Sequence, residues 1–282
     1  MPTDFLKNWN KITRKNISII SLVNKEISTV EYFNSVIYQI YSKMVFKIIR
    51  NELVICKPSS IMGNYSIIKY CNMNNTDTTD HYLLSNGVTI RGHNINGLKD
   101  KFGDEYVYNT NECIEKKGTK FNRFRNILNR YKNTYSKLGY TNEIDDIVNK
   151  WSIKNKSKHQ IKLLKVIKEY LDLVTITRVY NNNNNIIGFS IIENINNKNG
   201  VIIQRLINPD IIETIIEPNI LIHYHDCINN PNKYLNIGAG RTKNIKNAKH
   251  KLRPYKMLKI NRKVSNIKLS KKEWFILKEN II

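Results

Sequence analysis

Acidic residues are scarce in this 282-residue chain. It contains 23 Asp and Glu against 46 Lys and Arg, which gives a formal net charge of +23. An excess of this size favours a polyanionic partner such as a nucleic acid. Asn, Ile and Lys are used heavily, as in proteins encoded by AT-rich genes, so part of the Lys surplus reflects composition.

Closely spaced cysteines and long apolar runs are also missing. Cys56, Cys71, Cys113 and Cys227 include no C-x-x-C pair, so the sequence signals neither a zinc knuckle nor a disulfide framework. No stretch approaches the roughly 20 apolar residues of a membrane helix. The N-terminal residues lack the charged and apolar regions of a signal peptide. We therefore expect a reduced, cytoplasmic protein without a membrane span.

The hydrophobic content is sufficient for a folded protein. Hydrophobic residues make up 41% of the chain and aromatic residues 10%, above the range in which burial fails to offset conformational entropy. The length allows two small domains or one large one. In the first hundred residues, Ser28–Tyr41 has helical spacing, and Lys43–Cys56 and Tyr65–Cys71 are typical of short strands.

The pattern is more regular after Gly118. In Thr119–Leu138 large apolar residues recur every three or four positions among basic ones, which predicts a single basic amphipathic helix. The elements expected after it are a helix over Ser157–Leu171, three antiparallel strands over Val174–Tyr180, Ile186–Glu193 and Val201–Ile207, a helix beginning at Pro218, a strand over Tyr234–Ile237, a basic segment over Arg241–His250 and a strand over Tyr255–Asn261.

This order of elements resembles the GCN5-related N-acetyltransferase (GNAT) fold. Three segments are also similar to the transferase domain of the phosphatidylglycerol lysyltransferase and Fem-type group. Lys116–Asn126 resembles that group's basic G-x-x-x-x-x-x-R-N helix start, and Ile187–Phe189 resembles the beginning of its strand after a hairpin. Tyr234–Gly238 followed by Ala248–Pro254 resembles its closing Y-x-x-x-G and F-K-x-K-[FW]-x-P motifs, although Ala248 replaces an aromatic residue.

The resemblance implies a fold and a donor. It implies an α/β (α+β) protein with a mixed, mainly antiparallel sheet flanked by helices, in two GNAT-like halves over residues 1–111 and 112–282. A splayed strand pair near the middle of the sheet holds the acyl donor, and backbone N–H groups of a bulged strand, here Val201–Ile207, hold its carbonyl group. The group uses aminoacyl-tRNA. Its lipid-modifying members have a membrane part that is absent here, so a lipid acceptor is not expected.

The linker Asn208–Pro218 bears on the choice of donor. It contains no glycine, and Asp210, Glu213 and Glu217 would repel the pyrophosphate that acetyl-CoA presents to a helix N-terminus. No cofactor follows with certainty. Aminoacyl-tRNA or an unusual donor of the acyl-CoA type fits the sequence better than acetyl-CoA.

Candidate site residues follow from the residues and from the resemblance. Small and basic residues after the strand Tyr234–Ile237 can approach a phosphate, and the resemblance adds the basic helix start and the closing lysines. The candidate donor- or phosphate-binding residues are Arg125, Asn126, Asn236, Gly238, Gly240, Arg241, Lys243, Lys249 and Lys251. Glu193 and Asp210, at the ends of adjacent strands, are the candidates for a general base.

A metal site is not expected from the histidines. His223 and His225 are two residues apart, and on a helix they point roughly 200° apart, so they cannot share an ion.

Three functions remain open. The first is an acyl- or aminoacyltransferase in which a nucleic acid carries the donor, as tRNA, or is the acceptor, as DNA with a modified base in a phage- or virus-like system. The second is a non-enzymatic nucleic-acid-binding protein whose Phe121, Phe124, Tyr131 and Tyr135 stack on bases; their helical spacing favours core packing instead. The third is a GNAT-like fold without chemistry.

Overall fold

Two compact units make up the chain. The computed structural model describes residues 7–61, 64–69, 77–86, 88–93, 95–100, 103–211, 215, 217–240, 242–267 and 270–273. Unit 1 combines Met1–Asp104 with Leu258–Ile282, and unit 2 is Glu105–Met257. The unit boundary therefore differs from the expected 111/112 division. The strand at Glu105 belongs to the second sheet, and the strand Asn261–Lys263 pairs within the first.

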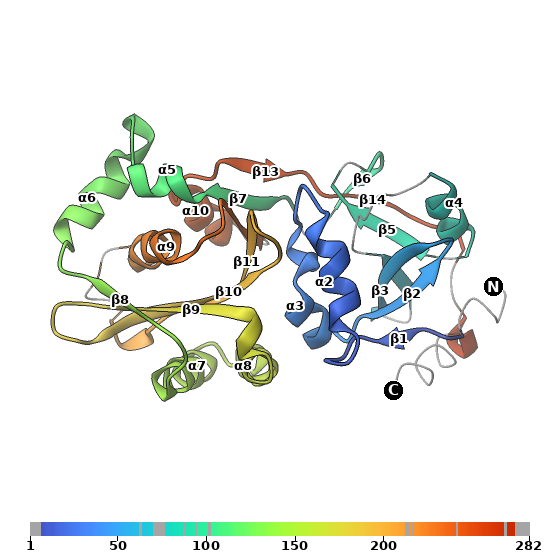
Figure 1. The fold of residues 1–282 in the computed structure, drawn as a ribbon, viewed down its shortest axis with the longest axis horizontal. Helices are drawn as coiled ribbons and strands as arrows, with labels where there is room; N and C mark the ends of the chain where they lie inside the picture. Colours follow the sequence, from blue (N-terminus) through green and yellow to red (C-terminus); the bar gives the residue numbers. More distant parts are fainter. Residues whose placement is uncertain are drawn as a thin grey trace. The chain divides into compact units, whose positions relative to one another are not determined.

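Unit 1 is built around a seven-stranded sheet with the order β1-β2-β3-β4-β5-β14-β6 (Figure 1). Its strands are β1 (Asn10–Lys11), β2 (Val45–Ile49), β3 (Glu52–Ile61), β4 (Asn64–Lys69), β5 (Val88–Gly92), β6 (Leu98–Lys99) and β14 (Asn261–Lys263). Its helices are α2 (Ile17–Lys25), the 3-10 turn η1 (Tyr32–Asn34), α3 (Val36–Tyr41) and α4 (Asp77–Ser85).

Unit 2 contains a second seven-stranded sheet with the order β13-β7-β12-β11-β10-β9-β8. Its strands are β7 (Glu105–Asn109), β8 (Tyr135–Leu138), β9 (Val174–Tyr180), β10 (Ile186–Asn194), β11 (Asn199–Ile207), β12 (Tyr234–Ala239) and β13 (Lys256–Leu258). Its helices are α5 (Thr110–Glu115), η2 (Thr119–Phe121), α6 (Asn122–Arg130), α7 (Asn142–Lys154), α8 (His159–Lys168), η3 (Leu171–Leu173), η4 (Pro209–Ile211), α9 (Pro218–Asn229) and α10 (Lys243–Lys251).

The two units repeat one arrangement. In each, two helices precede three antiparallel strands, and a further helix leads to a strand that pairs in parallel with the third. The parallel pairs are β4 with β5 in unit 1 and β11 with β12 in unit 2. This repeat agrees with the expectation of two similar halves.

Most predicted elements of unit 2 are confirmed, with one clear error. The three predicted strands are β9, β10 and β11, the helix at Pro218 is α9, and the basic segment forms α10. The single helix predicted over Thr119–Leu138 is wrong, because α6 ends at Arg130 and residues from Tyr135 form β8. Tyr135 pairs with Tyr180 of β9 and their rings stack, so its helical spacing from Tyr131 is coincidental.

Other departures are smaller. The helix α7 has no counterpart among the predicted elements, the predicted helix over Ser28–Tyr41 is only η1 and α3, and the strand predicted over Tyr255–Asn261 is divided between β13 and β14. Within the described residues, no helix is long and apolar enough to cross a membrane.

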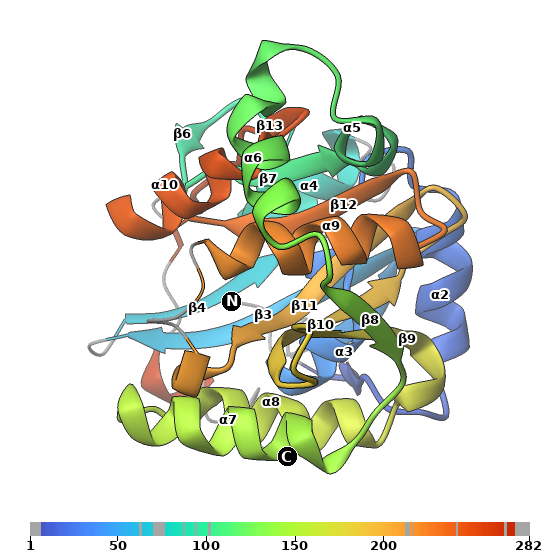
Figure 2. The ribbon, with the colours of Figure 1, turned by 90° about the vertical axis from the view of Figure 1, so that its left-hand side faces the viewer.

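Helices cover both faces of the unit 2 sheet. Figures 1 and 2 show α9 on one face and α7 with α8 on the other. The core under α9 includes Ile220, Leu221 and Ile222, which pack with Phe121 and Phe124 of the α6 region. The buried side chains of α9 thus fix the helix against β9 and β10 of the sheet.

Gly188 of β10 gives a direct test of this packing. A Cβ atom at this position would lie 2.4 Å from the carbonyl oxygen of Leu206 and 2.7 Å from Cδ1 of Ile222. We expect Gly188→Ala to destabilise the protein by about 1–3 kcal/mol, as overpacking does in a close-packed core. Urea unfolding followed by circular dichroism measures the effect. Asn182→Ala, at an exposed position of the neighbouring hairpin turn, is the control; equal stabilities of the two variants would contradict the packing described.

Candidate functional site

The strands β11 and β12 part near the middle of the unit 2 sheet. They pair in parallel over Asn199–Val201 and Tyr234–Asn236, whereas β11 continues to Ile207 and β12 to Ala239. In the described part of the chain, the register gives no further pairs between these two strands. An opening of this kind is the place that the resemblance assigns to an acyl donor.

Both parting strands are bulged. In β11, Gln204 opposes Ile191 and Ile202 opposes Ile192, so Ile203 is an extra residue. The bulge expected in Val201–Ile207 is thereby confirmed. In β12 the register against β7 shifts between Asn236 and Ala239, where Gly238 has a φ of +68°, a conformation that glycine adopts without steric cost.

The side chain of Lys249 binds the carbonyl groups at the end of β12 that lies beyond its pairing with β11. Its Nζ donates hydrogen bonds of 2.5, 2.7 and 2.9 Å to the carbonyl oxygens of Ile237, Gly238 and Ala239. The Tyr108 hydroxyl donates to the Lys249 carbonyl oxygen at 2.8 Å, which fixes this turn of α10. The pKa of Lys249 is lowered to about 7, mainly by burial; the charge of Glu105 opposes this shift, and the charge of Arg205 adds to it. Near neutral pH the charged and the neutral form of this amine are therefore both populated.

Asn236 and Gly238 shape the bulge of β12. The side-chain amide of Asn236 donates from Nδ2 to the Glu105 carboxylate at 2.8 Å, and its Oδ1 accepts from the Gly238 N–H at 2.7 Å. At Gly240 an added Cβ would lie 3.2 Å from the Cα of Lys246 on α10. These three candidates therefore have clear structural roles beside Lys249, and phosphate binding by them stays a prediction.

A buried polar group lies under α9. Arg205 of β11 donates from Nη2 to Nδ1 of His223 at 3.2 Å and to the carboxylate of Asp226. Burial raises the pKa of Asp226, and the Arg205 charge opposes that shift. The ring of Tyr108 packs edge-on against His223 with centroids 4.7 Å apart. Arg205 thus ties the parting strand to α9.

Cations surround the beginning of α9. Glu217, the residue before the helix, has a φ of +55°. Its carboxylate accepts from Arg123 at 2.5 and 2.8 Å and pairs with Lys251 at 2.8 Å. Two positive charges therefore meet one negative charge here, which weakens the electrostatic objection to a phosphate-bearing donor. Glu213 lies outside the described residues.

The two predicted general bases are not brought together. Asp210 is exposed and pairs with Lys150 at 2.5 Å. Glu193 is buried in β10 between its ladder partners Val174 and Val201. Glu193 lies on the same ladder row as Asn236, and a general-base role for either carboxylate stays a prediction.

The remaining candidates are spread over unit 2. Arg125 donates to the carbonyl oxygens of Lys116 and Gly118, so it holds the loop before α6. Asn126 and Lys243 are exposed. Arg241 lies outside the described residues.

The aromatic residues considered for base stacking are mostly part of the fold. Phe121 and Phe124 are fully buried, and Tyr131 packs against the same core. Tyr135 stacks on Tyr180 at a centroid distance of 5.3 Å. Stacking of Phe121 and Phe124 on nucleic-acid bases is therefore excluded by their burial.

The sequence reading missed a cluster of sulfur and imidazole groups beside Tyr108. Cys113 of α5 lies next to His223 and Cys227 of α9, and all three are buried. A hydrogen bond with Cys227 lowers the pKa of Cys113 to about 5, whereas burial raises that of Cys227. The spacing H-x-x-x-C was the available signal, since residues four apart share one helical face.

Comparisons with known proteins bear on the fold. No known family and no curated protein matches the sequence. Among solved structures, a protein of unknown function from Bacteroides thetaiotaomicron VPI-5482 superposes with a TM-score of 0.73 at 14% identity, covering 91% of this chain and 98% of its own. L-PGS from Bacillus licheniformis superposes with a TM-score of 0.63 at 11% identity, covering 96% of this chain and 98% of its own.

FemX gives a TM-score of 0.55 at 6% identity, covering 87% of this chain and 94% of its own. The chain has a tandem GNAT-like fold. At these identities the likeness establishes the fold alone. It confirms the mixed, mainly antiparallel sheets flanked by helices in two GNAT-like halves.

The low pKa of Lys249 has a consequence for stability. Between about pH 7 and the ordinary lysine value of about 10.4, the unfolded chain binds more protons than the folded chain, so folding becomes more favourable as the pH rises. The Lys249→Met variant has no titrating amine at this position and therefore lacks this increase in stability with pH. The free energy of unfolding of wild type minus that of Lys249→Met should therefore increase above pH 7, by at most about 1.4 kcal/mol per pH unit.

Urea unfolding of both proteins from about pH 6 to about pH 9 measures this difference. Loss of the three hydrogen bonds adds a constant offset, which does not affect the slope. A difference that stays flat over this range would contradict a perturbed Lys249.

Proposed function

We propose that this protein is an aminoacyl- or acyltransferase that forms an amide bond at the opening between β11 and β12. The observation that carries the proposal is the conjunction of the two bulged, parting strands with Lys249, a buried amine whose pKa is about 7. A group that titrates near the working pH is suited to general acid–base catalysis. The tandem GNAT-like fold supports the same class of reaction.

The proposed reaction is attack of an acceptor amine on the ester carbonyl of the donor. A C–N bond forms, the C–O bond to the carrier breaks, and the carrier leaves as a hydroxyl group. The amine must lose a proton during this step. We assign that proton to Nζ of neutral Lys249, which then returns it to the leaving oxygen of the carrier, and following the resemblance we assign the developing oxyanion to backbone N–H groups of the bulged β11.

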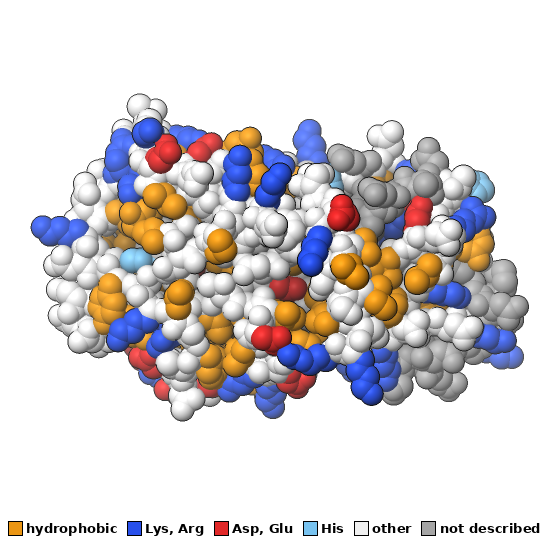
Figure 3. Space-filling model, viewed as in Figure 1, with side chains coloured by type: hydrophobic (Ala, Val, Ile, Leu, Met, Phe, Trp, Pro, Cys, Tyr) orange, Lys and Arg blue, Asp and Glu red, His pale blue; other side chains and the backbone are white. Residues whose placement is uncertain are grey.

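For the donor we propose aminoacyl-tRNA, the donor of the group that the sequence resembles. Figure 3 shows Lys and Arg side chains along the edge formed by α5 and α6 in unit 2, with a few acidic side chains among them. The helix α10 adds exposed Lys243 and Lys246. Phosphate contacts by such residues would make binding strongly dependent on salt.

A transfer assay with the full chain tests the proposal. Aminoacyl-tRNA carrying a labelled amino acid is mixed with candidate amine acceptors, and with DNA to test a modified base as the acceptor, and mass gain is followed. We expect Lys249→Met to lower kcat/KM by about 10²–10⁴-fold, the usual contribution of a general base. Lys165→Met, an exposed lysine on α8, is the matched control.

The pH profile separates the role of Lys249 from a structural one. If neutral Lys249 accepts the proton, kcat/KM of the wild type rises with pH through an apparent pKa near 7, and this rise is absent from the residual activity of Lys249→Met. Salt-dependent tRNA binding without transfer to any acceptor would instead favour the non-enzymatic binding protein.

A further inference from the structure

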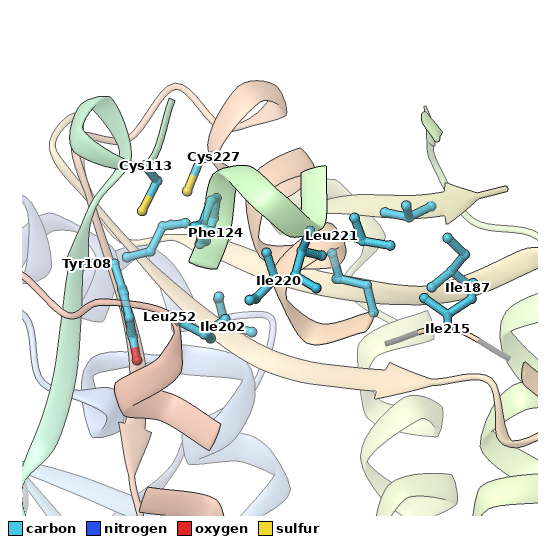
Figure 4. Packing of buried hydrophobic residues seen from close by; sticks show 14 of the residues in the cluster. Tyr108, Cys113, Phe124, Ile187, Ile202, Ile215, Ile220, Leu221, Cys227 and Leu252 are labelled. Atoms are coloured by element: carbon cyan, nitrogen blue, oxygen red, sulfur yellow. The ribbon is translucent and has the colours of Figure 1, made fainter. Parts of the chain in front are cut away.

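Three metal-binding atoms lie close together inside unit 2. Nε2 of His223 is 3.5 Å from Sγ of Cys113 and 3.9 Å from Sγ of Cys227, and all three atoms lie within 4.8 Å of one another. The three residues are buried. Figure 4 shows the two sulfur atoms near each other beside Phe124, with Tyr108 next to Cys113.

The two sulfur–nitrogen separations are close to those of a tetrahedral zinc site. With Zn–S bonds of about 2.3 Å and Zn–N bonds of about 2.0–2.1 Å, tetrahedral angles place sulfur and nitrogen about 3.5 Å apart and two sulfurs about 3.8 Å apart. The two S–N distances observed here differ from that value by a few tenths of an ångström at most. The two sulfurs need to approach each other by no more than about 1 Å.

The backbone holds the ligands in place. His223 and Cys227 are four residues apart on α9 and so project from one face of the helix. Cys113 comes from α5, which begins directly after β7, with the Asn109 side chain accepting from the N–H groups of Asn111 and Glu112. Two helices distant in sequence therefore supply one chelating group. His225 is directed elsewhere, with Nε2 3.3 Å from the Thr134 hydroxyl.

The charges of the three ligands suit a soft divalent cation. Two thiolates balance the charge of Zn²⁺, and neutral imidazole completes the set, so the buried site carries no net charge. Thiolate and imidazole ligands favour zinc over the hard cations Mg²⁺ and Ca²⁺.

We propose that Cys113, His223 and Cys227 form a zinc site with a fourth position left for water. Three protein ligands with one exchangeable position is the usual composition of an open zinc site. The site would join α5 to α9. It does not depend on the transferase proposal, because only the three side chains and their packing enter the argument.

Asp226, held by Arg205, would provide the outer contact of the site. Arg205 donates to Nδ1 of His223, so in the metal-free protein that nitrogen accepts a hydrogen bond. With zinc on Nε2, Nδ1 carries the proton and requires an acceptor. Asp226, three residues further along α9 and bonded to the same Arg205 nitrogen, is the carboxylate available for it. Carboxylate–histidine–zinc contacts of this kind raise the basicity of the ligand.

Cobalt titration of the reduced full-length protein tests the site. Under anaerobic conditions we expect one equivalent of Co²⁺ to produce a thiolate-to-cobalt charge-transfer band and visible bands of tetrahedral coordination, which Zn²⁺ then abolishes. In Cys227→Ser only one thiolate remains, so the charge-transfer band should be weaker than in the wild type or lost. Cys56→Ala, which removes a buried thiol of unit 1, should keep the band unchanged.

Thermal unfolding provides a second readout. Zn²⁺ that binds only the folded state raises the Tm of the wild type, and the shift should vanish in Cys227→Ser and in Cys113→Ser. Circular dichroism of the metal-free variants establishes whether they are folded. One folded variant of the two is sufficient for the test. A wild-type protein with titratable thiols and no cobalt charge-transfer band would overturn the proposal. So would a band of equal intensity in a folded Cys227→Ser protein.

Discussion

The separation of β12 from β11 is the constraint on which the site in unit 2 depends. A strand that leaves its neighbour gives up ladder hydrogen bonds, and buried carbonyl groups without partners cost free energy. At the end of β12 a side chain replaces the missing ladder partners, because Nζ of Lys249 donates hydrogen bonds to three successive carbonyl oxygens. An ammonium group is well suited to this task, since it offers three donors. The consequence is a cation in a buried position, where its charged form is disfavoured.

The low pKa of Lys249 therefore follows from the way in which the sheet opens. Arg205 strengthens the effect, because its positive charge also lowers the pKa of Lys249. Its own charge is balanced by Asp226, so one buried ion pair both anchors α9 to β11 and adjusts the neighbouring amine. Fold and chemistry are coupled here: replacing the ion pair with apolar side chains could preserve the packing of α9, but it would remove a charge that acts on Lys249.

Sequence patterns predicted the three hairpin strands of unit 2 closely, but they gave no strand for β7 and assigned β8 to a helix. The strands β9, β10 and β11 alternate with asparagine-rich turns, and their predicted bounds agree with the structure to within two residues. The helix predicted over Thr119–Leu138 failed because its apolar spacing continues past the end of α6. The ring of Tyr135 stacks on Tyr180, a residue distant in sequence, and local periodicity gives no information on such a contact.

The candidate site shows the same limit more sharply. Lys249 was accessible from sequence because it lies in a short closing motif, whereas Asp210 was chosen for its position at a strand end and pairs instead with an exposed lysine. The cysteines were dismissed because none lies within a short spacing of another. Yet the pairing of β12 with β7 brings α5 against α9, so that Cys113 meets His223 across 110 residues. Spacing rules describe ligands carried by one local segment. Here two of the three ligands, His223 and Cys227, lie on one helix, whereas Cys113 comes from a distant segment that the sheet brings close. A cluster of this kind becomes predictable only once the strand order is known, because the sheet and not the sequence interval sets the distance between its members.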